Sequence, residues 1–112
     1  MLTSKELLAA CNQQVGNEFA ASLQYVSIAA YFDGQTLIEL AKFFYAQAEE
    51  ERDHAMKFVR FITDAGGDLK IPEIPAARSG FDAASDAVGL ALESEERVTQ
   101  QIYELVNIAT RD

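Results

Sequence analysis

Three long stretches of this 112-residue sequence contain almost no helix-breaking residue. Both prolines lie in one segment, Pro72 to Pro75, and most glycines stand between the stretches. Within each stretch, apolar residues recur every three to four positions, which is the spacing of an amphipathic α-helix. We therefore predict helices over about residues 4–32, 37–65 and 83–111, each about 43 Å long at a rise of about 1.5 Å per residue. Three rods of similar length predict an all-α bundle.

The two connections between these helices differ in length, and the difference predicts the topology. The turn at Asp33–Gly34 is short, so the first two helices are expected to be antiparallel neighbours. The second link runs from Asp68 to about Phe81 and contains both prolines, which favour an extended chain. Such a segment reaches about 40 Å, enough to cross the bundle and to begin the third helix at its far end.

Local signals mark the ends and the interiors of the predicted helices. Thr3 and Thr36 each precede a glutamate by three residues, which is the spacing of a capping box at a helix start. Gly16 and Gly89 fall inside helices, where each costs up to about 1 kcal/mol relative to alanine.

Length and charge limit the partners of this chain. The length suits a single domain over residues 1–112. The sequence carries 18 acidic and 9 basic side chains, a net charge of -9, which favours cations over a nucleic-acid backbone. No apolar run reaches the roughly 18 residues of a membrane span. A single cysteine, Cys11, excludes an internal disulfide and fits a reducing compartment, so we expect a cytoplasmic protein.

Ionisable residues interrupt the apolar stripes of all three predicted helices near their middle. Glu18 and Glu51 are the midpoints of the first two helices, and Glu95 lies within one turn of the midpoint of the third. His54 follows Glu51 at a spacing of three, which places both on one helix face. The predicted stripe of the third helix consists of Ala84, Val88, Leu92, Glu95, Val98, Ile102, Leu105 and Ala109.

These carboxylates have no basic partner on the three stripes. Ionised carboxylates in a core are unfavourable unless they are paired, protonated or bound to a metal. Three glutamates and one imidazole that converge without a basic residue therefore predict a cation site. Oxygen-rich ligation with one imidazole favours iron or manganese over copper or a structural zinc.

Each of these residues also has a simpler explanation when it is taken alone. A single glutamate such as Glu95 on a predicted apolar stripe more often means that the edge of the stripe is placed wrongly. A single histidine such as His54 is more often a packed core residue. Glu49–Glu51 is an acidic run of the kind found on solvated faces, and Tyr25 is by default a buried aromatic residue. A bundle with simply protonated carboxylates is a further alternative. The coincidence on three helices favours the metal site.

At these residues the sequence resembles the ferritin family, specifically the bacterial non-haem ferritins, over the whole chain. The motifs that carry the resemblance are Asn17-Glu18-Phe19 with Gln24-Tyr25, then Glu50-Glu51-Arg52-Asp53-His54-Ala55, and then Glu95 with Val98-Thr99-Gln100-Gln101-Ile102 and Glu104-Leu105. The resemblance implies a ferritin-like bundle that contains a ferroxidase centre. Haem-binding bacterioferritins carry methionine where Arg52 stands, so no haem is expected.

The resemblance also implies individual roles at this centre. Glu18, Glu51 and His54 would hold a first iron, Glu51 would bridge to a second iron held also by Glu95, Tyr25 would supply an electron, and Glu50 would bind a third iron. The implied reaction is oxidation of Fe(II) by dioxygen or peroxide. Storage of ferric mineral in a cytoplasmic shell of 24 identical subunits would follow.

One departure from the family concerns length. Its members continue into a fourth long helix, whereas this sequence ends at Asp112 where the turn to that helix would begin. We expect either a fragment or a gap filled by another chain, such as a separate C-terminal piece or a swapped second copy. The alternative function is a truncated ferritin-like assembly module that binds metal weakly without turnover.

Overall fold

Three long α-helices make up most of the described chain. The computed structural model describes residues 3–111, in which α1 spans Lys5–Gly34, α2 spans Ile38–Asp64 and α3 spans Ala84–Arg111, with no strand in this range. These bounds lie within two residues of the predicted ones. None of these helices is long and apolar enough to cross a membrane. Residues 1, 2 and 112 of the expected domain lie outside the described range.

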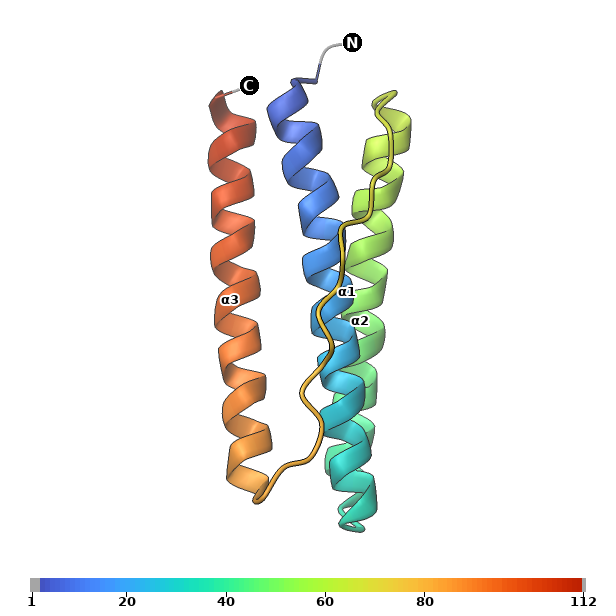
Figure 1. Cartoon of the computed structure of the whole chain (residues 1–112), viewed down its shortest axis with the longest axis vertical. Helices are drawn as coiled ribbons and strands as arrows, with labels where there is room; N and C mark the ends of the chain where they lie inside the picture. The colour runs from blue at the N-terminus through green and yellow to red at the C-terminus, as the bar shows by residue number, and fades with distance from the viewer. Residues whose placement is uncertain (1–2, 112) are drawn as a thin grey trace.

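The helix α1 is the central element of the bundle (Figure 1). Both α2 and α3 pack against α1 and run antiparallel to it, and together they form a rod of 51 × 22 × 21 Å. Within residues 3–111, no Cα atom of α2 comes within 8 Å of one in α3. The predicted topology of an antiparallel hairpin, a long crossover and a third helix is confirmed.

The crossover between α2 and α3 runs along α1 for most of the length of the bundle (Figure 1). Three α1 side chains hold it through its backbone, and one of them is Ser27, whose hydroxyl donates to the carbonyl of Arg78 at 2.6 Å. Asn12 donates to the carbonyl of Asp68 at 3.0 Å and accepts from the Lys70 amide at 2.6 Å. Gln24 donates to the carbonyl of Arg78 at 3.0 Å and accepts from its amide at 2.9 Å. These contacts fasten an irregular segment whose amides and carbonyls lack a helical partner.

The core is divided along the rod into two apolar clusters. One cluster is built around Tyr25, Phe32 and Phe44, with stacked rings 5.6 to 6.0 Å apart. The other is built around Val15 and Ile62 near the opposite end. In both α1 and α2, the mid-helix glutamates lie between the residues of these clusters.

The predicted stripe of α3 is largely exposed, which corrects the prediction that it is buried. The side chains that α3 buries are small ones, Ala87, Ala91 and Ser94. Val88 and Leu92, on the predicted stripe, are 39% and 62% exposed. Among the described residues, α1 is the only helix that packs against α3. The apolar face of α3 is therefore uncovered, as are Leu40 and Phe61 on α2 and Leu37 just before it.

The predicted helix caps are also corrected. Ser4, not Thr3, caps α1, and its side chain accepts a hydrogen bond from the Leu7 amide at 3.0 Å. No side chain caps α2, because Thr36 adopts a φ of 59° and its hydroxyl donates instead to the carbonyl of Gln35.

Candidate metal centre

Glu18, Glu51 and His54 form the centre of the polar layer between the two apolar clusters. Glu18 comes from the buried face of α1, and the other two come from one face of α2, where a spacing of three residues aligns them. Glu18 is 1% and Glu51 is 4% exposed. The antiparallel pairing of two helices of similar length brings their midpoints to one level, as the sequence predicted.

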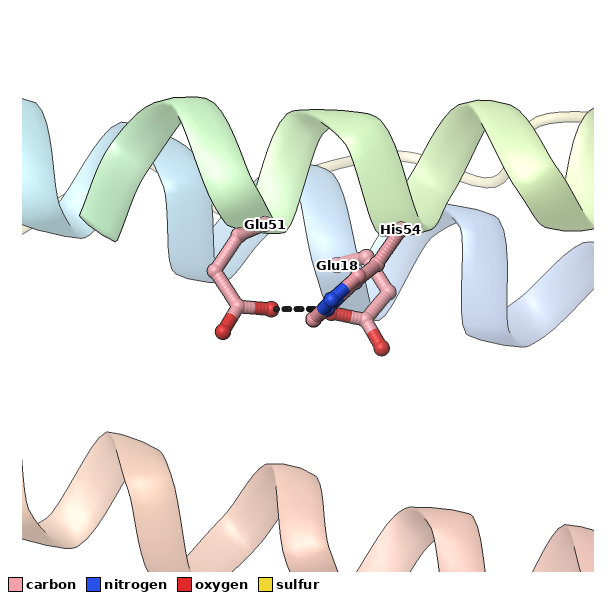
Figure 2. Close-up of side chains that lie close together, drawn as sticks. All are labelled: Glu18, Glu51 and His54. Carbon is pink, nitrogen blue, oxygen red and sulfur yellow. Dashed lines mark ion pairs between the residues drawn. The ribbon is translucent and has the colours of Figure 1, made fainter. Parts of the chain in front are cut away.

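The three side chains converge on one point. One ligand atom from each lies within 4.8 Å of the other two. The Nδ1 atom of His54 lies 3.5 Å from Oε2 of Glu51 and 3.9 Å from Oε2 of Glu18. Figure 2 shows all three directed away from the α1–α2 hairpin toward the side occupied by α3. Two carboxylates and one imidazole at this separation match the ligand types and the spacing of a cation site.

The electrostatics of this group favour a cation. Within residues 3–111, no group hydrogen-bonds to Oε2 of Glu18 or of Glu51, and no lysine or arginine pairs with either carboxylate. Burial raises the pKa of Glu51, and the adjacent carboxyl group of Glu18 raises it further. Without a metal, the surroundings of Glu51 therefore favour its protonated form over its ionised form. A bound cation would displace that proton and satisfy both free oxygens.

Glu95 lies beside this group without joining it. It lines the same cavity of about 510 Å³ as Glu18, Glu51 and His54, but it is exposed and is not among the three converging residues. Its carboxylate accepts a hydrogen bond from the hydroxyl of Tyr25. The expected burial of Glu95 is wrong because nothing in the described chain covers that face of α3.

Tyr25 connects the apolar core to the cavity. Its ring is 2% exposed and stacks on Phe44, while its hydroxyl reaches Glu95. Burial raises the pKa of this hydroxyl, and the Glu95 carboxylate raises it further, so Tyr25 keeps its proton. The hydroxyl of Tyr25 therefore contacts Glu95 rather than the three converging residues, and the place of Tyr25 at the centre and its role as an electron donor stay predictions.

The exposure of His54 and Glu50 limits two further expectations about the centre. The side chain of His54 is 47% exposed, so the expected dry interior holds at the two buried glutamates but not at the imidazole. Glu50 is exposed and lies outside both the converging group and the cavity lining. Its assignment as a ligand of a third iron stays a prediction.

Sequence reasoning missed one residue at this centre, Gln14. Its side-chain amide is 3% exposed and donates to Oε1 of Glu18 at 3.1 Å. The signal was present in the sequence, because a glutamine four residues before a buried glutamate lies on the same helix face.

Comparison with known proteins identifies the family. Residues 8–112 match the family model described as a ferritin-like domain. The chain is 35% identical over 111 residues to the bacterial non-heme ferritin of Staphylococcus haemolyticus, which covers 99% of this chain and 67% of the relative. This chain belongs to the ferritin family. It is also 46% identical over 101 residues to ferritin BfrB of Mycolicibacterium smegmatis, covering 90% of this chain.

Solved structures agree with this ferritin assignment. A crystal structure of an iron-soaked PmFTN variant superposes with a TM-score of 0.90 at 32% identity, covering 96% of this chain and 69% of the other. An engineered closed form of the Archaeoglobus fulgidus ferritin gives the same TM-score and identity, over 97% of this chain and 66% of the other. The chain spans 56% of the length of the mycobacterial ferritin. The ferritin-like fold is thus confirmed for three helices.

Proposed function

We propose that this chain is an iron-storage ferritin subunit that oxidises Fe(II) to Fe(III) for mineral deposition. The observation that carries the proposal is the convergence of Glu18, Glu51 and His54 on one point, with two buried carboxylate oxygens that no donor satisfies. Membership of the ferritin family and the iron-soaked structural relative support iron as the cation.

In this proposal, each residue binds or positions the substrate iron. Glu18, Glu51 and His54 hold the first Fe(II), and Glu51 reaches toward a second that Glu95 also binds. Each Fe(II) gives up one electron, and dioxygen or peroxide accepts the electrons. The hydroxyl of Tyr25, which donates a hydrogen bond to Glu95, would supply an electron to the same centre.

Assembly and compartment complete the proposal. We infer a homo-oligomer, with a shell of 24 subunits as the arrangement expected from the family resemblance. The net charge of -9 favours attraction of cations to such a shell. Arg52 replaces the methionine of haem-binding relatives, so the proposed centre works without haem. With one cysteine the chain cannot form an internal disulfide, which favours a cytoplasmic location.

A second candidate function is an assembly module that binds metal weakly without turnover. The exposure of Glu95 favours it, because a half-formed second iron position would bind only weakly. Particle size and iron content separate the two functions. A hollow particle of about 24 subunits that accumulates iron supports storage, whereas a small dimer or an open aggregate without iron uptake supports the module.

The deciding experiment is Fe(II) oxidation followed by absorbance of Fe(III), with wild type, Glu51→Ala and Glu49→Ala compared. Glu49 is an exposed glutamate on the same helix and serves as the matched control. We expect oxidation faster than in buffer for wild type and for Glu49→Ala, and loss of that rate for Glu51→Ala. A wild-type rate equal to that of buffer would refute the ferroxidase proposal for this chain.

A further inference from the structure

A chain of three amide side chains on α1 leads from the surface to the metal centre. The exposed Gln13 donates through Nε2 to Oδ1 of Asn17 at 3.2 Å. Asn17 donates through Nδ2 to Oε1 of Gln14 at 3.2 Å. Gln14 donates through Nε2 to Oε1 of Glu18 at 3.1 Å. Asn17 and Gln14 therefore each accept through the oxygen from the surface side and donate through the nitrogen toward the buried carboxylate.

This direction follows from the chemistry of the end group. A glutamine amide presents either an oxygen acceptor or an N–H donor, and the two ends exchange by a flip of the group. With the Gln14 oxygen facing Glu18, two acceptors would meet in a buried site, which is unfavourable. Asn17 donates to the Gln14 oxygen and so stabilises the orientation in which the Gln14 nitrogen donates to Glu18.

The two oxygens of Glu18 have different surroundings as a result. Oε1 is held by Gln14, whereas Oε2 has no donor in the described chain and lies 3.9 Å from Nδ1 of His54. Because Gln14 holds Oε1, the carboxylate of Glu18 cannot rotate freely about its Cγ–Cδ bond. The free oxygen is then the one that faces the other two ligands.

We propose that Gln14 is a positioning residue of the metal centre: its amide, oriented by Asn17, holds Oε1 of Glu18 so that Oε2 alone is presented to the cation. Gln14 itself does not touch the metal. This inference rests on the proposed function, since it assumes that Glu18 binds a cation. Residues that orient metal ligands in this way commonly change metal affinity when they are replaced.

The test uses Co(II), whose visible absorption reports the geometry and the number of its ligands. Wild type, Gln14→Leu, Asn17→Leu and Gln24→Leu are titrated with Co(II), and folding is checked by far-ultraviolet circular dichroism. Gln24 is the matched control, because it is a glutamine on the same helix whose two hydrogen bonds go to Arg78 rather than to the centre.

We expect Gln14→Leu to bind Co(II) about tenfold more weakly, at the lower end of the 10- to 100-fold range for such residues. Its Co(II) absorption should also change, since Glu18 becomes free to rotate and to bind through both oxygens. Gln24→Leu should match wild type in both respects. Weaker binding with an unchanged spectrum would indicate only a structural role and would overturn the proposal, as would unchanged affinity.

Two outcomes separate this inference from the proposed function. If wild type itself binds no Co(II), the metal-site proposal fails first. If wild type binds and the folded Gln14→Leu variant is indistinguishable from it, only the positioning role fails. Should Gln14→Leu not fold, Asn17→Leu decides: an altered Co(II) spectrum supports the proposal, and a wild-type spectrum overturns it.

Discussion

Replacement of Gly16 by alanine tests how closely the crossover packs on α1. Gly16 is buried in the middle of that helix, and a Cβ atom added there would overlap Cγ of Pro72 and lie 3.0 Å from its Cδ. The proline ring is joined to the backbone, so the crossover itself must move to make room. Alanine gains about 1 kcal/mol of helix propensity, whereas overpacking of this kind costs about 1–3 kcal/mol.

We therefore expect Gly16→Ala to be net destabilising by about 1 kcal/mol, which lowers the melting temperature by about 4 °C or slightly more for a chain of this size. Gly89→Ala is the matched control, since Gly89 also lies inside a helix but a Cβ atom there meets nothing within 4 Å. That variant should gain about 0.5–1 kcal/mol. Thermal unfolding followed by circular dichroism measures both. If Gly16→Ala raises the melting temperature as Gly89→Ala does, the close packing inferred here is wrong.

Three further predictions concern buried groups of the α1–α2 hairpin. Because the pKa of Glu51 is raised from 4.5 to about 9, the folded metal-free protein holds a proton that the unfolded chain loses, so stability should fall as the pH rises through this window. The free energy of unfolding should fall by at most about 1.4 kcal/mol per pH unit. Urea denaturation at several pH values measures this dependence, and Glu51→Gln should reduce it. Cys11 is 3% exposed and burial raises the pKa of its thiol, so a thiol reagent should label it only in denaturant; rapid labelling of the native protein would contradict this. Ser22→Ala should cost about 0.5–1.5 kcal/mol in urea denaturation, because it removes the 2.7 Å hydrogen bond to the carbonyl of Ala48; an unchanged midpoint would show that this bond contributes nothing.

Much of the fold was predictable because helix signals are local. Breaker-free stretches defined three helices, and a short and a long connection defined their order. The buried face of α1 was also predicted correctly, since α1 has neighbours on two sides and its apolar residues, such as Val15 and Phe32, are fully buried. The convergence of Glu18 and Glu51 then followed from the antiparallel pairing of helix midpoints.

The errors arose where the outcome depends on tertiary surroundings. The stripe of α3 was expected to be buried, but burial depends on which neighbours are present, and Leu92 and Glu95 face a side that no described residue covers. The cap of α2 was wrong because Thr36 adopts a left-handed conformation, which residue type alone does not reveal. Gln14 was missed because the stripe traced along the first helix ran through Val15 and Glu18 and left out the glutamine beside them.

The central position of α1 has a mechanical consequence. Since α2 and α3 do not pack on each other, detachment of α3 breaks its packing on α1, which includes Ala87, Ala91 and Ser94, and the hydrogen bond from Tyr25 to Glu95. The hairpin that carries Glu18, Glu51 and His54 is untouched by that event. Detachment of α3 would thus expose the three converging side chains without separating them.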